Sequence, residues 1–210
     1  MTVGPAIAVI LALLQSGGNY GRPLDTPANR AAGMLRFSGG CAVRDVPASA
    51  RKVLATQVAS DQEARAVRAL TGVARKCYPI QMPAFPPTAV RGSVAEALYR
   101  STLGRTKPHM VSAPPPTSFT VVPAGQSGTP AQETAWSLAA VGRCAVYADA
   151  PAAHEWVMGP ANVPEEERRF GLLKPALARC VPAAQLDQIT PGLLRGFVAE
   201  ALLDRGKDAQ

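Results

Sequence analysis

Histidine, aromatic residues and recognisable catalytic motifs are scarce in this sequence, and their scarcity excludes several classes of protein. There are two histidines, and we find no His-Glu-x-x-His or Cys-x-x-Cys pattern, no Gly-x-Ser-x-Gly elbow and no glycine-rich phosphate loop. Aromatic residues make up 5% of the chain, too few for the stacking surfaces of nucleic-acid-binding proteins. The sequence therefore predicts no metal, no cofactor and no nucleic-acid partner, and it favours a non-enzymatic role.

Long hydrophobic runs are also missing. The one apolar run near the N-terminus, Ala6–Leu14, would rise about 14 Å as a helix, against about 30 Å for a bilayer core. Small and polar residues follow it, which is typical of a secretory signal, although residues 1–5 carry no Lys or Arg. We expect residues 1–18 to be a signal peptide and the mature protein to be periplasmic or secreted, without a membrane span. The alternative is a buried N-terminal helix of a cytoplasmic protein.

What the sequence does contain is an internal repeat. Cys41 and Cys77 have the same separation as Cys144 and Cys180, and Cys-Ala-Val begins at the first cysteine of each pair. Farther on, RGSVAEAL is echoed by RGFVAEAL. The expected organisation is a flexible lead-in at 19–30, a first repeat at 31–103, a Pro/Ser/Gly-rich linker at 104–131 and a second repeat at 132–205.

Four cysteines in an exported chain predict disulfides, for which three pairings are possible. The duplication favours Cys41 with Cys77 and Cys144 with Cys180, because each repeat then folds as a stapled unit. Each bridge would contribute about 4 kcal/mol in the chain-entropy description. Reduced, buried cysteines are the alternative, and a metal site lacks the necessary ligand spacing.

Helix signals recur at matching places, and strict strand-like alternation is absent. We expect four helices in each repeat: 31–42, 47–56, a third that begins at Ser60 and a fourth capped by Thr88, with counterparts at 133–147, 151–158, after Asn162 and after Thr190. Ser60 and Glu63 fit a capping box. Gly72 and Pro175 should kink or break the third helices. The predicted fold is all-α, with two tandem disulfide-braced four-helix repeats packed as a pseudo-dimer.

The repeated Arg-Gly-x-Val-Ala-Glu-Ala-Leu element is the best matched part of the two repeats. Its arginine and glutamate are five residues apart, so they lie on different sides of a helix and should contact other elements rather than each other. Gly92 and Gly196 suggest a close helix crossing. We expect this element to tie the last helix to its own repeat.

Charge is unevenly distributed between the repeats. Residues 21–107 hold 14 Lys and Arg against 5 Asp and Glu, whereas residues 108–210 hold 8 against 10. A basic first repeat could contact an anionic envelope component or another protein, or it could simply be a solvated face. The second repeat alone carries tryptophan, which either fills a larger core or offers a contact surface. The candidate binding surface comprises Arg65, Arg68, Trp136, His154 and Trp156.

The Cys-Ala-Val starts and the Arg-Gly-x-Val-Ala-Glu-Ala-Leu-Tyr element at 91–99 resemble those of a group of uncharacterised bacterial secreted proteins with tandem helical repeats. The resemblance implies an exported helical protein and supplies no activity. A Cys-x-Pro followed by a helix is also similar to small disulfide-braced helical immunity proteins, which points towards binding. We therefore expect a non-enzymatic binding or structural protein of the cell envelope. The alternative is a small envelope enzyme with a site near His154 and Glu165–Glu167.

Overall fold

The computed structural model describes residues 27–79, 85–103, 127–160, 163–186 and 189–208. The expected signal segment 1–18, most of the linker 104–131 and the cap residue Asn162 lie outside these residues. Every regular element in the described part is a helix, so the all-α prediction is confirmed. None of these helices is both long and apolar enough to cross a membrane.

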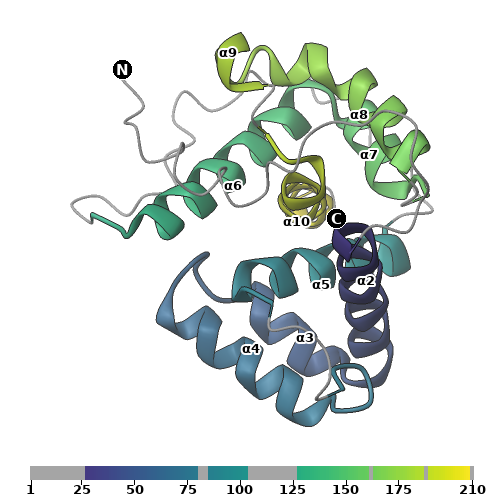
Figure 1. Ribbon diagram of the computed structural model, residues 1–210, viewed down its shortest axis with the longest axis vertical. Helices are drawn as coiled ribbons and strands as arrows, with labels where there is room; N and C mark the ends of the chain where they lie inside the picture. The colour runs from purple at the N-terminus through teal and green to yellow at the C-terminus, as the bar shows by residue number, and fades with distance from the viewer. Residues whose placement is uncertain (1–26, 80–84, 104–126, 161–162, 187–188, 209–210) are drawn as a thin grey trace.

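The first half of the described chain, residues 27–103, contains the helices α2 (Pro27–Asp45), α3 (Pro47–Leu54), α4 (Asp61–Val73) and α5 (Pro87–Thr102). The second half, residues 127–208, contains α6 (Pro130–Ala148), α7 (Ala150–Met158), α8 (Val163–Leu177), α9 (Ala183–Leu186) and α10 (Pro191–Asp208). The short α9 was not expected from the sequence. Figure 1 shows α5 and α10 packed between the remaining helices of the two halves.

Helix ends follow the local chemistry, with three departures from expectation. Ser60 accepts a hydrogen bond from the Glu63 backbone N–H as predicted, but the Glu63 carboxylate accepts from the N–H of Ala59 rather than of Ser60. The helix α5 begins at Pro87, which places Thr88 inside the first turn, because the fixed φ of proline suits the first helical position. Similarly, α2 begins at Pro27, before the expected start at 31.

The expected interruption of the third helices occurs in the first half only. The helix α4 ends at Val73, directly after Gly72, whereas α8 continues through Pro175 to Leu177. Pro175 removes one backbone donor, but it lies in the last turn, beside exposed helix surface where water can satisfy the carbonyl left without a partner. The helix α8 is therefore not broken at Pro175, which was one of the two outcomes predicted there.

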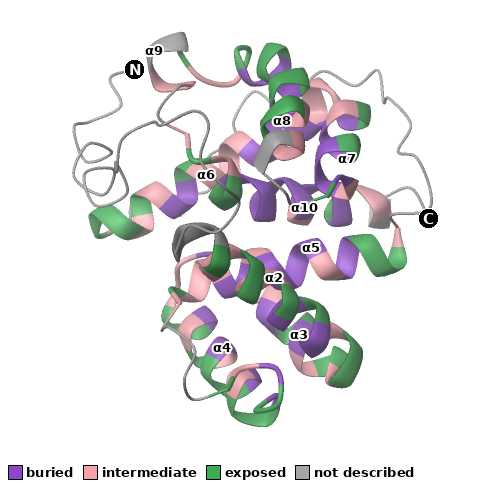
Figure 2. Cartoon of the chain, turned by 45° about the vertical axis from the view of Figure 1, so that its right-hand side comes forward, coloured by how far each residue is buried: buried purple, intermediate pink, exposed green. Residues whose placement is uncertain are grey.

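One hydrophobic core runs through both halves. It includes Val94 and Leu98 of α5, Leu194 and Val198 of α10, and Trp156 of α7, all buried. Figure 2 shows α5 and α10 mostly in the buried colour, while the outer helices carry exposed faces. The halves therefore share their interior, and the contact between α5 and α10 is the structural centre of the molecule.

The α5–α10 contact is built from the repeated Arg-Gly element. Gly92 and Gly196 face each other, and a Cβ placed on Gly92 would lie 3.1 Å from the Gly196 Cα. The backbones can approach this closely only because neither residue has a side chain. The close crossing suggested by the sequence is present, and it joins the two halves.

Arg91 and Arg195, the arginines of the two copies of this element, make equivalent hydrogen bonds. Arg91 donates to the carbonyls of Val53 and Leu54 at the end of α3, and to both carboxylate oxygens of Glu200 on α10. Each donation to a helix C-terminus satisfies carbonyls that lack a partner inside the helix. The element thus ties α5 to its own half, as expected, and also reaches across to the other.

Arg195 repeats this arrangement from α10. It donates to the carbonyls of Val157 and Gly159 at the end of α7, and to Glu96 of α5. Burial acts to lower the pKa of both guanidinium groups; for Arg91 the bonds and charge of Glu200 outweigh burial and its pKa is raised, whereas for Arg195 burial prevails and its pKa is lowered.

Candidate functional site

A groove of about 790 Å³ opens in the first half between α2, α3 and α5. Its size lies within the range of natural ligand sites. The three helices meet here because Gly39 brings α2 against α5, where a Cβ would lie 2.6 Å from the Ser93 carbonyl oxygen. The apolar and small residues of the groove are Phe37, Gly40, Val43, Pro47, Ala97 and Leu98.

Arginine side chains surround this apolar floor. Arg36 and Arg44 come from α2, Arg51 from α3 and Arg100 from α5. Arg44 pairs with Asp45 at 2.9 Å, and its side chain is 72% exposed. Arg51 is exposed, and its side chain makes no hydrogen bond or ion pair with the described residues. The groove thus combines an apolar floor with a cationic rim.

Among the described residues, Glu96 is the one carboxylate that lines the groove, and arginines balance its charge. Its Oε1 lies 3.1 Å from Arg100 and 3.0 Å from the buried Arg195, while its Oε2 lies 3.4 Å from Arg36. Three guanidinium groups therefore share this carboxylate. Arg36 also bonds Glu166 of α8 at 2.8 Å. The groove consequently keeps an excess of positive charge despite Glu96.

Phe37 is the unusual side chain at this site. It is 72% exposed, and Met34, one turn before it on α2, is 40% exposed. Apolar residues of this size are exposed individually in most proteins, but these two lie together on the margin of an apolar groove. Such a patch is typical of a contact surface.

The residues proposed from the sequence as a binding surface do not gather at one place. Arg65 and Arg68 lie on the exposed face of α4. Trp136 and Trp156 are buried, and Trp156 packs against Phe170 with ring centroids 5.1 Å apart. The tryptophans therefore fill the core, which was the other interpretation of their presence.

His154 is also buried, and its Nδ1 lies 2.7 Å from the Tyr99 hydroxyl. Burial raises the pKa of Tyr99 to about 12, so the phenol stays protonated. The pair connects α7 with α5 in the interior of the protein. The alternative enzymatic site would need His154 to be reachable from solvent. The structure instead encloses this side chain in the interior.

The glutamate run is engaged by arginines. Glu165 accepts from Arg168 and Arg169 at 2.6 Å each, which lowers the pKa of its carboxyl to about 2. Arg169 also forms an ion pair with Glu155, with 3.3 Å between the two groups. The Glu165 carboxylate is thus paired and ionised, an arrangement suited to structure rather than to proton transfer.

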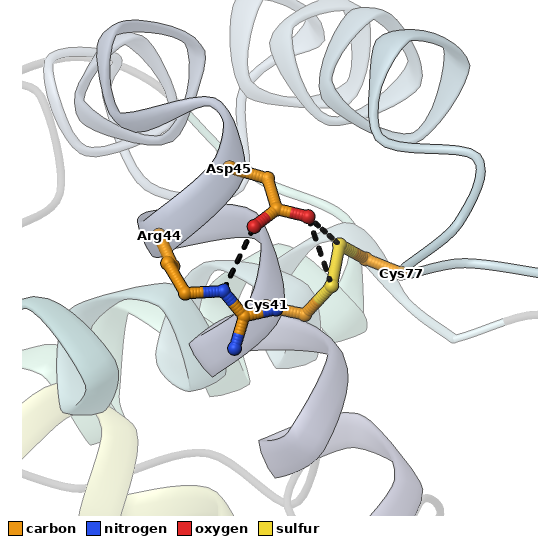
Figure 3. The surroundings of a disulfide bond; sticks show 4 residues. All are labelled: Cys41, Arg44, Asp45 and Cys77. Atoms are coloured by element: carbon orange, nitrogen blue, oxygen red, sulfur yellow. Dashed lines mark hydrogen bonds and ion pairs between the residues drawn. A yellow bond between two sulfur atoms is a disulfide. The ribbon is translucent and has the colours of Figure 1, made fainter.

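Both disulfides form as predicted. The Cα atoms of Cys41 and Cys77 are 5.5 Å apart, and those of Cys144 and Cys180 are 5.8 Å apart. Figure 3 shows Asp45 directed at the first bridge, with one carboxylate oxygen 3.7 Å from the Cys41 Sγ and 3.9 Å from the Cys77 Sγ. Sulfurs joined to each other carry no proton to donate and no free thiolate, so these three side chains form no metal site in the oxidised protein.

Sequence reasoning missed the groove. It identified the basic character of the first half but selected Arg65 and Arg68 instead of Arg36, Arg44 and Arg51. One signal was available, because Phe37 lies among glycines and arginines in α2, with Gly33 and Gly40 one turn before and after it. Such a phenylalanine is expected on the surface.

Comparisons with protein families, with curated proteins and with solved structures found no match to this chain. The geometry of the groove therefore carries the functional argument by itself.

Proposed function

We propose that this is an exported, non-enzymatic binding protein that holds an anionic partner in the groove between α2, α3 and α5. The observation that carries the proposal is the combination of an apolar floor with four arginines around it. Apolar contact supplies affinity, while fixed positive charges select an anionic partner and speed its encounter.

Export is supported by the cysteines. All four are paired, in bridges that persist in oxidising compartments and are rare in the cytosol of most organisms. The apolar run Ala6–Leu14 and the small residues after it supply the expected signal. Mass spectrometry of the secreted or periplasmic fraction tests this directly, through the N-terminal residue and the disulfide-linked peptides.

We also infer that the two halves are copies packed as a pseudo-dimer. The supporting contacts are reciprocal: Arg91 of the first half pairs with Glu200 of the second, and Arg195 of the second pairs with Glu96 of the first. In this arrangement the two copies share one scaffold, and the groove lies in the first copy, which is the more basic of the two.

Site-specific photocrosslinking in the cells that make the protein tests the binding role. A crosslinker at Ser101, which is exposed in the groove, should give a discrete adduct with a partner. The same group at Ser137, exposed on α6 in the other half, is the matched control and should not give it. The double variant Arg44→Glu, Arg51→Glu should abolish the Ser101 adduct. Identical adducts from both positions, or adducts that survive charge reversal, would contradict the proposal.

A further inference from the structure

The outward face of α2 holds two glycines that the described fold does not require. Gly33 and Gly40 lie on one side of the helix, two turns apart, with the exposed Phe37 between them. A Cβ placed on either glycine would meet nothing within 4 Å among the described residues. Glycine is unfavourable within a helix when nothing demands it. These two positions therefore leave the α2 backbone open to an element from outside.

Some helical glycines coincide with close contacts: Gly39 of the same helix meets the Ser93 carbonyl, Gly142 meets the backbone of Phe197, and Gly92 meets Gly196. Gly72, Gly171 and Gly192 are open, as Gly33 and Gly40 are. Gly33 and Gly40 differ from those three in forming a pair that flanks an exposed phenylalanine on one helix face, where both leave room for a second helix to cross α2 closely. Phe37, between them, is placed to insert into that helix.

Charge decides which element fits. The α2 face continues into the groove with Arg36, Arg44 and Arg51, so the matching surface is acidic on its flanks. A second copy of this chain would bring one basic first half against another. The chain's own residues 104–126 hold Arg105 and Lys107 and no Asp or Glu, so they do not offer the complementary charge either. An acidic partner helix meets both requirements.

We propose that α2 is a docking surface for an acidic amphipathic helix of another protein, which crosses at Gly33 and Gly40 and receives Phe37 into its apolar face. This inference rests on the proposed binding role of the groove and specifies its partner. Helix-in-groove recognition uses apolar anchors spaced along one helix face, which Met34 and Phe37 provide. The arginines on the rim fix the orientation and exclude basic helices.

The test uses two synthetic helical peptides of about 20 residues. One has a leucine and alanine seam flanked by glutamates; the other has lysines in place of the glutamates. Titration calorimetry on the full chain should detect the glutamate peptide, with affinity falling as salt rises, and should not detect the lysine peptide. Phe37→Ala should weaken binding by about tenfold or more.

Glycine substitutions separate docking from folding. Gly40→Ala should raise the thermal unfolding midpoint by about 2–4 °C, because alanine favours the helix. It should nevertheless lower the affinity for the glutamate peptide by about tenfold, because the added methyl group holds the peptide away from α2. Gly171→Ala is the matched control: Gly171 is exposed on α8 and a Cβ there meets nothing within 4 Å. It should raise the midpoint similarly and leave binding unchanged. Gly40→Leu should abolish binding in a folded protein.

Several outcomes would overturn the inference. They are no binding of the glutamate peptide up to about 1 mM, equal binding of the lysine peptide, and unchanged binding by Gly40→Leu. Sedimentation as a dimer that Gly40→Leu dissociates would assign the face to a second copy. Capture by phosphatidylglycerol vesicles that Phe37→Ala abolishes would assign it to a membrane. If the Ser101 crosslink is lost on charge reversal but the glycine variants have no effect, the groove binds a partner in another form and only this inference fails.

Discussion

Glu200→Gln should destabilise the protein far more than the loss of an exposed ion pair, because it takes from the buried Arg91 the carboxylate that accepts its hydrogen bonds. The Arg91 side chain is 2% exposed and that of Glu200 is 16% exposed, with 2.5 Å between Nη2 and Oε1. Removing one partner of a buried pair typically costs about 3–5 kcal/mol. Since water can reach Glu200 to a limited extent, we expect about 3 kcal/mol.

The assays are urea unfolding and thermal unfolding of the oxidised protein, both followed by circular dichroism. A loss of about 3 kcal/mol should lower the thermal midpoint by about 9 °C. Arg91→Met should cost at least as much, because the carbonyls of Val53 and Leu54 also lose the hydrogen bonds that the guanidinium donates. In a double-mutant cycle the pair should show a coupling of about 2 kcal/mol. The coupling energy of this buried pair should change little between low and high salt.

Glu165→Gln is the control for this experiment. The Glu165 carboxylate accepts from Arg168 at 2.6 Å and its pKa is lowered, but the Arg168 side chain is 58% exposed and solvent screens the pair. Its substitution should leave the midpoint nearly unchanged. If Glu200→Gln behaved like Glu165→Gln, or if the coupling between Arg91 and Glu200 were near zero, the central role assigned to the reciprocal pairs would be refuted.

Three further changes have defined outcomes. Gly196→Ala should lower stability by about 1–3 kcal/mol in urea unfolding, through overpacking against the Gly92 backbone; a stabilised variant would disprove the close crossing. Burial raises the pKa of Glu63 despite nearby Arg91, so its contribution to stability is fully present below the ordinary pKa and is lost as pH rises through the raised value. Glu63→Gln should remove that decline, seen as a difference in unfolding free energy between variant and wild type that grows with pH; a constant difference would contradict it. Asp45→Asn should speed reduction of the Cys41–Cys77 bridge by dithiothreitol about threefold at low salt, because the carboxylate repels the attacking thiolate, while the other bridge serves as internal control and is unaffected.

Much of the fold could be predicted from the sequence because its determinants are local or duplicated. Ser60 caps α4 through an interaction three residues long, and the equal spacing of the cysteines pointed to the correct pairing. The sequence could not decide whether Pro175 breaks its helix, because the effect of a proline depends on how near the helix end lies, and the sequence does not define that end. Thr129 and Gln132 form a capping box whose pattern is present in the sequence and was overlooked.

The candidate site was less accessible to prediction because it depends on tertiary placement. Nothing local distinguishes Arg51, which lies on the groove, from Arg65, which faces solvent on α4. Trp156 and His154 have the residue types of a binding site, but the packing of α7 against α5 and α8 places both in the interior. Exposure of Phe37 follows from how α2 sits on α5, which is fixed by the contact between Gly39 and Ser93.

The positions of the two tryptophans have a consequence for how the molecule can be observed. Trp156 packs against Phe170 of its own half within the shared core, whereas the Trp136 indole N–H donates to the Val58 carbonyl of the first half at 2.9 Å. Trp156 therefore reports on the packing of the shared core around α7, and Trp136 reports on a hydrogen bond between the halves. In variants that retain one tryptophan, coincident emission changes would mean that the shared interior makes the chain a single cooperative unit.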